Sequence, residues 1–320
     1  MTLRYVKNHP LETNITMRKA YGDALSDEAK NNDRIYIVDS DISSPPRSWF
    51  VANAPERVIE TGLTEANAIG IAAGLASEGK IPYWFNMGFL LTTVYSQMRQ
   101  SVAEDMRNVK IICYACGVSG VGGRSHNYVE DFALMRSIPN FMVLSPADIT
   151  ELKKMVKASV MYHGPVYIRF PREPPLPIIF EEDYPFSMGK GTWVKEGRDG
   201  TIIATGSMVG ESLIAANHMK SEGADIGVLN ISSLKPLDRE AIAAAAESSF
   251  IVTAEDHSVI GGLGDAVASV VSEENPVKVI KMGVNDQFCS SGQLDCRKYY
   301  GLESANIVEI LRLAVKRYHK

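Results

Sequence analysis

Short apolar runs alternate with longer amphipathic segments along the chain. The runs DRIYIVDSD (33–41), IPYWFNM (81–87) and VKIICYAC (109–116) are rich in β-branched and aromatic residues and are predicted to be strands. ANAIGIAAGLASEG (66–79) and TTVYSQMRQSVAEDM (92–106) are long enough to be helices and are predicted as such. This alternation favours βαβ units, and therefore a mostly parallel sheet covered by helices on both faces.

The alternation is interrupted by one segment rich in proline and acidic residues, PREPPLPIIFEEDYPFS (171–187), and then resumes up to a terminal helix predicted over 304–320. A chain of 320 residues is long enough for two domains. We therefore predict an α/β protein with one domain over 1–172, a linker over 173–190 and a smaller α/β domain over 191–320.

Composition narrows the class of protein. Apolar residues make up 45% of the chain, charged residues 22%, and the formal net charge is −5 without a long basic run. A nucleic-acid-binding surface is therefore not expected. The N-terminus is polar, and no apolar run is long enough to span a bilayer. These features predict a cytoplasmic protein without a membrane segment.

The four cysteines do not have the spacing of a typical zinc site. Cys113 and Cys116 have the C-x-x-C spacing, but Cys289 and Cys296 are too far apart in sequence to form a second close pair of zinc ligands. The first pair also lies in an apolar run. We therefore favour buried free thiols over a zinc site.

Glu65 is the most informative acidic residue. It stands between the short β segment ERVIET (56–61) and a helix built from Ala, Gly, Ile and Leu, which Thr61 or Thr64 can cap. A carboxylate in a first helical turn is stabilised by the helix dipole, so position alone allows a purely structural role. However, the small residues that follow let another backbone approach closely, which favours a tight interface.

Several motifs occur in an order that resembles one family. GLTEAN, GIAAGLA, GGRSHN and IPNFMVLSPAD resemble the pyrimidine-binding domain of transketolase. TIIATGSMVGESLIAA, LNISSLKPLD, IVTAEDHSVIGGLGDAV and GVNDQFCSSG resemble its C-terminal domain. The resemblance covers nearly the whole chain and implies thiamine diphosphate as the cofactor and the transfer of a two-carbon ketol unit from a ketose to an aldose.

The resemblance gives Glu65 a catalytic role. Thiamine diphosphate reacts through its thiazolium C2, which the cofactor's own 4′-amino group deprotonates. A carboxyl hydrogen-bonded to the ring N1′ shifts the aminopyrimidine to its imino form and makes this nitrogen a base. A glutamate in an enclosed site can share a proton in this way because its pKa can be tuned there.

Other cofactor contacts are implied by position. Asp41 matches an acid that lies beside the cofactor in the family. Phe89 and Tyr95 fall where aromatic residues line the aminopyrimidine pocket, and flat rings suit that heterocycle. Because WFNM adds residues before Phe89, this stretch can be aligned with the family motif in more than one way. Thr92 is the alternative for the position that stacks on the pyrimidine. Core packing is the alternative role for both aromatic residues.

Substrate contacts follow in the same way. His126 matches the histidine that faces the substrate's hydroxyl groups, in the kind of loop that holds ligands in open α/β sheets. Arg18 and Arg172 match arginines that bind the terminal phosphate, for which guanidinium geometry is suited. Surface ion pairs are the structural alternative for both arginines.

Three positions depart from the family pattern. Tyr114 replaces a histidine, Gly122 replaces an aspartate that reads the configuration of a sugar hydroxyl, and Arg124 replaces a proline. We expect these changes to alter the acceptor end of the site, with Arg124 as a further substrate contact. The ordinary pentose phosphates are therefore in doubt as substrates. Apulose 4-phosphate or a sulfonated ketose becomes a candidate substrate.

The chain lacks the G-D-G…N signature with which the family grips the diphosphate and its metal. We therefore expect no metal ligand in this chain. We expect an N-terminal transketolase subunit as partner, holding Mg²⁺ or Ca²⁺, in an α2β2 assembly. The alternatives are the β subunit of a thiamine-dependent 2-oxoacid dehydrogenase, deoxyxylulose-phosphate synthase and a non-catalytic copy. Arg18 and Arg172 argue against the dehydrogenase subunit. The length of the chain argues against deoxyxylulose-phosphate synthase, and the presence of Glu65 argues against a non-catalytic copy.

Overall fold

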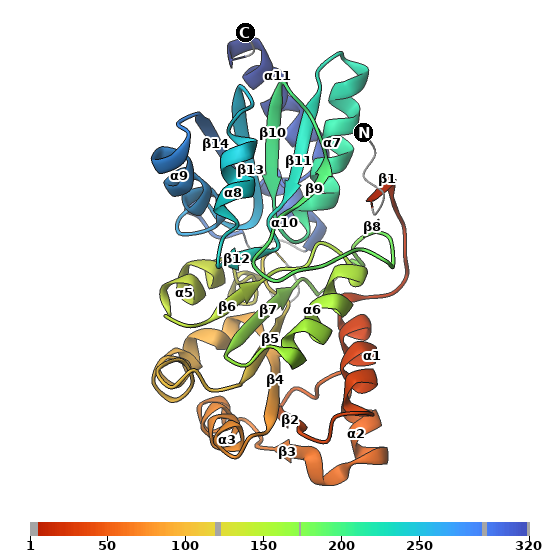
Figure 1. Cartoon of the computed structure of the whole chain (residues 1–320), viewed down its shortest axis with the longest axis vertical. Coiled ribbons are helices and arrows are strands. Elements are labelled where there is room, and N and C mark those ends of the chain that lie inside the picture. Colours follow the sequence, from red (N-terminus) through yellow and green to blue (C-terminus); the bar gives the residue numbers. More distant parts are fainter. Residues whose placement is uncertain (1–5, 119–122, 173, 290–292, 319–320) are drawn as a thin grey trace.

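The computed structural model describes residues 6–118, 123–172, 174–289 and 293–318. The chain forms two stacked α/β lobes, the N-terminal one below and the C-terminal one above in Figure 1. Both lobes contain mostly parallel sheets flanked by helices, which confirms the predicted fold class. Among the described residues, no helix is both long and apolar enough to cross a membrane.

The N-terminal lobe is built on a sheet with seven strands in its described part, in the order β12-β6-β7-β5-β4-β2-β3. All neighbouring strands are parallel except β12 and β6. The strands are β2 (Ile35–Asp39), β3 (Val58–Glu60), β4 (Ile81–Met87), β5 (Lys110–Tyr114), β6 (Met142–Leu144), β7 (Val166–Phe170) and β12 (Ser233–Lys235).

Helices cover both faces of this sheet, as β4 illustrates. Tyr83 and Phe85 pack in one hydrophobic cluster with α1 and α6, whereas Trp84 packs on the opposite face with α3. Successive side chains of a strand point to opposite faces, so a strand covered on both sides is apolar throughout. The helices are α1 (Met17–Ala29), α2 (Arg47–Asn53), α3 (Glu65–Ser77), α5 (Asp131–Ser137) and α6 (Ile149–Met161).

The segment predicted as one helix over 92–106 is more irregular than expected. A 3₁₀ segment spans Gly88–Val94, a single turn, α4, spans Tyr95–Gln97, and a π-helical stretch spans Met98–Ala103. The expectation of one regular helix was therefore wrong. Adjacent β-branched residues at Thr92, Thr93 and Val94 are poor helix formers, which fits the tighter 3₁₀ geometry there.

The C-terminal lobe has a five-stranded sheet in its described part, in the order β14-β13-β10-β11-β9, with β9 antiparallel. Its strands are β9 (Thr192–Lys195), β10 (Gly200–Ala204), β11 (Ile226–Asn230), β13 (Phe250–Ser258) and β14 (Lys278–Val284). Helices α7 and α11 pack on one face, and α8 and α9 on the other. The helices are α7 (Met208–Ser221), α8 (Arg239–Ala245), α9 (Leu263–Glu274), α10 (Gln293–Tyr299) and α11 (Ser304–Tyr318).

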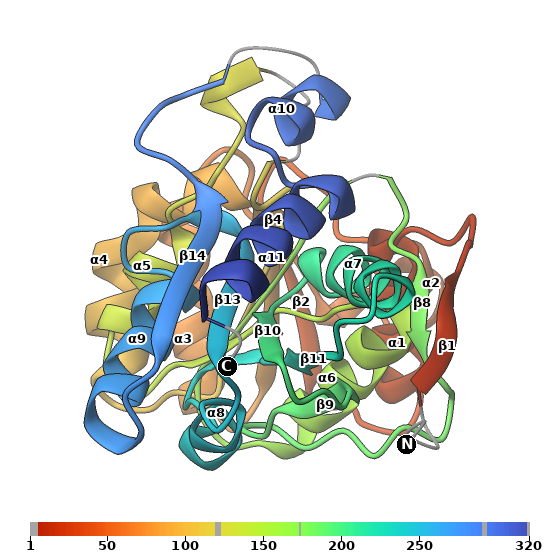
Figure 2. The same cartoon turned by 90° about the horizontal axis from the view of Figure 1, so that it is seen from above.

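The two lobes share structural elements. Strand β12 follows the C-terminal lobe's β11 in sequence, yet it pairs with β6 of the N-terminal sheet. The predicted linker also contains a strand, β8 (Ile178–Phe180), which pairs antiparallel with β1 (Val6–Leu11) beside α7 (Figure 2). One hydrophobic cluster contains residues of both lobes. The lobes are therefore held together by shared core and sheet.

Candidate functional site

Glu65 begins α3 at the carboxyl-end edge of the N-terminal sheet. Its side chain is half-buried and has no hydrogen-bond or ion-pair partner among the described residues. Thr64 occupies the N-cap position, but its hydroxyl donates to the carbonyl of Thr61, 2.7 Å away, instead of capping the helix. The carboxylate thus stands at the positive end of a helix, with its oxygens open to a ligand.

The loop before Glu65 is fixed to the end of β2. The backbone N–H of Thr61 donates to the carbonyl of Asp39 at 2.9 Å. The Asp39 carboxyl is buried and pairs with Arg47 at 3.1 Å, and Arg47 also pairs with Glu60. Burial raises the pKa of Asp39, although the neighbouring Ser44 and Arg47 groups oppose the rise. This cluster was not singled out from the sequence.

Asp41, the acid expected beside the cofactor, lies just beyond this cluster. It is exposed, and its side chain has no partner in the described part of the chain. The buried acid at the end of β2 is Asp39, whose second carboxyl oxygen has no hydrogen-bond partner there. The side-chain nitrogen of Asn86, at the end of neighbouring β4, likewise has none. Two unsatisfied buried polar groups therefore occur at adjacent strand ends.

Phe89 lines a cavity at the same edge of the sheet, and its ring packs against that of His126, which is not itself part of the lining. Their rings are 4.5 Å apart between centroids, and the His126 Nδ1 lies 3.0 Å from the Ser125 hydroxyl. The cavity measures about 490 Å³, and its lining includes Phe89, Thr92, Arg124, Asn127, Glu130 and Phe288. Burial raises the pKa of Glu130. The sequence did not single out three of these residues as members of the site: Asn127, Glu130 and Phe288.

Tyr95 does not belong to the lining of this cavity. Its hydroxyl lies 3.1 Å from that of Ser137, and its ring is partly buried against the core. Thr92, the alternative for the stacking position, is exposed and lines the cavity, and its hydroxyl donates to the carbonyl of Phe89. Gly122 lies outside the described residues.

The expected substrate arginines lie near the ends of two neighbouring strands. The Arg18 guanidinium is stacked above the rings of Phe85 and Tyr114, 5.6 and 5.1 Å from their centroids, and donates to the carbonyl of Ser43. Tyr114 ends β5 and is in register with Phe170 of β7, two residues before Arg172. Tyr114, which replaces the family histidine, thus supports Arg18.

A buried ionic cluster lies under the loop that carries His126. Arg169 pairs with Asp131 at 3.1 Å and, across the lobe boundary, with Asp256 at 2.6 Å. Gly117 rests against this cluster at a φ of +72°, and its N–H donates to the carbonyl of Tyr128 at 2.7 Å. The C-terminal lobe thereby fixes the base of the loop.

Two further buried groups of β13 lie near this point, and one of them, His257, joins the lobes. His257 accepts a hydrogen bond from the N–H of Phe132, and burial lowers its pKa to about 3, so that it is neutral. Burial raises the pKa of Glu255 to about 8, although the N–H groups of Leu263 and Gly264 donate to it. Both groups have structural partners and lie outside the cavity lining.

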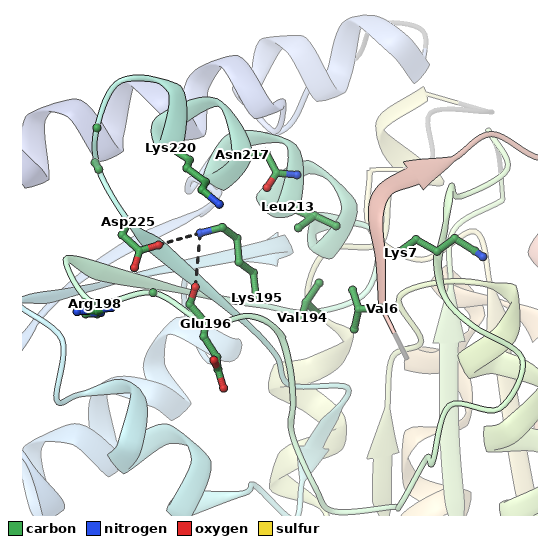
Figure 3. A pocket seen from close by; sticks show the side chains of 13 residues that line it. Val6, Lys7, Val194, Lys195, Glu196, Arg198, Leu213, Asn217, Lys220 and Asp225 are labelled. Carbon is green, nitrogen blue, oxygen red and sulfur yellow. Dashed lines mark hydrogen bonds and ion pairs between the residues drawn. The ribbon is translucent and has the colours of Figure 1, made fainter. Parts of the chain in front are cut away.

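A separate cavity of about 600 Å³ lies on the C-terminal lobe between α7, β9 and β1 (Figure 3). Lys195 reaches into it, and its amine donates to the carbonyl of Ile226 at 2.6 Å and to Asp225 at 3.3 Å. None of the residues predicted for the site lines this cavity. The candidate site is therefore the edge of the N-terminal sheet.

Two family models match the chain in succession. Residues 13–174 match the transketolase pyrimidine-binding domain, and residues 189–307 match the transketolase C-terminal domain. The chain belongs to the transketolase family. The resemblance implied a glutamate at the start of a small-residue helix and aromatic residues nearby, and here α3 opens with Glu65 and packs against the segment that carries Phe89.

Relatives of the protein are transketolase subunits. It is 39% identical over 311 residues to the 6-deoxy-6-sulfo-D-fructose transketolase subunit SqwH of Clostridium sp. (strain MSTE9), covering 94% of this chain and 96% of the relative. It is 34% identical over 309 residues to an apulose-4-phosphate transketolase subunit of Phocaeicola vulgatus, covering 95% of this chain and 98% of that relative.

A solved structure is similar over a comparable length. A split gene transketolase, an inactive β4 tetramer, superposes with a TM-score of 0.89 at 40% identity, covering 95% of this chain and all of that one. Together with the two relatives, it confirms the prediction of a transketolase subunit that corresponds to the enzyme's C-terminal half.

The transketolase family implies thiamine diphosphate, and the residues present fit its pyrimidine half. Glu65 offers an unpaired carboxylate, and α3 packs against the 3₁₀ segment that carries Phe89. The Phe89 ring faces a cavity open to a flat heterocycle. The unpaired Asn86 amide adds a hydrogen-bond donor at a neighbouring strand end.

Proposed function

We propose that this transketolase chain supplies the acid–base group and the sugar-binding residues of a two-chain enzyme. A separate N-terminal subunit would supply the diphosphate site and its Mg²⁺ or Ca²⁺, in an α2β2 assembly. The observation that carries the proposal is the unpaired Glu65 carboxylate at the start of α3, the helix that packs against the 3₁₀ segment carrying Phe89. The similar split gene transketolase, inactive as a β4 tetramer, supports the need for a partner.

Each residue has a defined task in this proposal. When bound, thiamine diphosphate supplies a nucleophilic carbon that takes up the two-carbon unit. Glu65 would hold a proton at the pyrimidine N1′, and Asp41 would lie beside the cofactor. Phe89 would stack on the pyrimidine ring, with Tyr95 supporting it from the core side. His126 would donate hydrogen bonds to substrate oxygens, because its half-buried imidazole packs against Phe89, a residue of the cavity lining.

The proposed substrates carry an anionic group. Arg18 of α1 lies over Tyr114 at the end of β5, Arg172 follows the neighbouring strand β7, and Arg124 adds a third guanidinium at the cavity. Guanidinium groups form charge-assisted hydrogen bonds with phosphate or sulfonate oxygens. One similar relative acts on a sulfonated ketose and another on apulose 4-phosphate. We therefore propose a phosphorylated or sulfonated ketose as donor, with an aldose as acceptor.

The first prediction concerns the partner. The chain alone should bind thiamine diphosphate poorly and show no ketol transfer, and a chain of about 250–300 residues that carries the diphosphate-binding domain should restore both. Calorimetric titration of the cofactor and a coupled transfer assay would measure this, and size-exclusion chromatography would test the expected closed dimer of pairs. Tight cofactor binding with turnover by the isolated chain would refute a two-chain enzyme.

The second prediction concerns Arg172. In the reconstituted enzyme, Arg172→Ala should raise KM for an anionic ketose about 10-fold or more and change kcat much less. A charge-assisted hydrogen bond contributes about 1.5–3 kcal/mol, and the anion is remote from the bond that breaks. Steady-state kinetics on matched anionic and neutral ketoses would measure the difference.

A surface arginine provides the control for this test. Arg34 is exposed, and Arg34→Ala should change neither constant. If Arg172→Ala impairs the neutral and the anionic ketose equally, Arg172 supports the structure and does not bind the anion.

A further inference from the structure

Cys289 and Cys296 lie side by side next to the candidate site. Their sulfur atoms are 3.0 Å apart, and both cysteines are buried and not joined by a disulfide bond. Cys289 lies in the stretch after β14, and Cys296 lies in α10. The wide spacing of this pair in the sequence gives no sign that the two thiols meet.

The surrounding hydrogen bonds hold the two cysteines in this position. The Tyr300 hydroxyl accepts from the N–H of Cys289 and donates to the carbonyl of Gln287 at 2.9 Å. The Tyr300 N–H donates to the carbonyl of Cys296 at 3.0 Å. A single residue therefore anchors the backbone on both sides of the pair and holds the two sulfur atoms close to each other.

The pair also touches the cavity from two directions. The Asn127 amide, which follows His126 and lines the cavity, donates to the Cys296 sulfur at 3.6 Å. Phe288, next to Cys289, lines the cavity and is 68% exposed. Figure 2 shows the yellow stretch from residue 123 onward near α10, in agreement with the contact between Asn127 and Cys296. A change at the sulfur atoms is therefore transmitted directly to the cavity wall.

We propose that Cys289 and Cys296 are a modification site that forms a reversible disulfide, and that closing it shifts the Phe288 wall of the cavity. Disulfide bonding brings two sulfur atoms to about 2.0 Å, so the observed gap must shorten by about 1 Å. Cys296 is completely buried in a helix, whereas Cys289 follows the exposed residues 285–288. The movement therefore falls on the Cys289 side, which carries Phe288.

The reaction takes a small-molecule disulfide as oxidant. The Cys289 thiolate, which keeps 6% exposure where Cys296 has none, attacks one sulfur of the oxidant and releases the first small thiolate. The Cys296 thiolate then attacks the Cys289 sulfur of this mixed disulfide and releases the second small thiolate. Two protons pass from the cysteines to the small thiolates, and the oxidant takes up both electrons.

Tryptic mass spectrometry tests the chemistry on the full-length chain. The peptide 282–297 contains both cysteines and no other. After incubation with oxidised glutathione and alkylation, this peptide should be lighter by two hydrogen atoms and resist alkylation until dithiothreitol is added. Cys113 and Cys116 should remain alkylatable in the denatured chain. Cys296→Ser should instead trap glutathione on Cys289, because the second attack is blocked.

Kinetics of the reconstituted enzyme test the effect on the cavity, and only this part rests on the proposed function. The oxidised enzyme should show a several-fold higher KM for its ketose, reversed by dithiothreitol, whereas Cys289→Ser should not respond to the oxidant. Full alkylation of both cysteines after oxidant treatment would overturn the disulfide. A disulfide without change in KM would overturn the shift of Phe288. Absence of turnover in the reduced enzyme would count against the proposed function alone.

Discussion

Glu65→Gln should lower kcat of the reconstituted enzyme by about 10²-fold or more, the size typical of lost acid–base assistance, while the fold stays intact. The amide keeps the shape of the side chain but cannot share a proton with a ring nitrogen. The wild-type carboxylate has no partner within the described residues, so its replacement breaks no contact of the folded chain. Steady-state kinetics with saturating cofactor, beside circular dichroism and thermal unfolding, would measure both effects.

A second glutamate of the same helix supplies the control. Glu78 stands at the opposite end of α3 and is exposed, so Glu78→Gln changes the charge equally without approaching the cavity. It should leave kcat unchanged. Near wild-type activity of Glu65→Gln would show that the assigned acid–base role is wrong.

Gly117→Ala should be strongly destabilising, by about 2–5 kcal/mol. A left-handed backbone costs a residue with a Cβ about 1–2 kcal/mol, and overpacking a filled interior costs about 1–3 kcal/mol more. The φ of Gly117 is +72°, and a Cβ there would lie 2.6 Å from the Arg169 guanidinium and from the carbonyl of Asp256. Urea-induced unfolding followed by tryptophan fluorescence would measure the shift.

Gly79→Ala separates the cost of the left-handed backbone from the cost of overpacking. Gly79 has a similar φ of +76°, but nothing lies within 4 Å of the position its Cβ would take. This variant should lose only the backbone contribution, about 1–2 kcal/mol. Equal losses in the two variants would mean that the ionic cluster yields to the added methyl group and does not fix the loop.

Local sequence pattern predicted the regular elements well. The predicted strand 81–87 matches β4 residue for residue, and the predicted helix 66–79 differs from α3 by one or two residues at each end. Strands β8 and β12 were missed because each is three residues long and gains its hydrogen bonds from a distant segment. Such pairings depend on tertiary context that a short window of sequence does not contain.

The candidate site was predictable to a smaller extent. The family motif pointed to Glu65 and His126, and the structure packs the His126 ring against Phe89, which lines the cavity. The Arg169 cluster could not be found in this way, because its partners lie 38 and 87 residues away. Opposite charges so far apart in sequence are common, and only the fold shows which ones meet in the interior.

The pairing of β12 with β6 affects how the chain folds during synthesis. Domains generally fold as they leave the ribosome, N-terminal part first. The N-terminal sheet, however, receives its last strand from residues 233–235, when more than two thirds of the chain has been made. Until then β6 is an uncovered edge with free N–H and C=O groups, which can pair with other nascent chains. The two lobes therefore complete their folding as one cooperative unit. Separate expression of the N-terminal lobe would leave the unpaired edge of β6 open to aggregation.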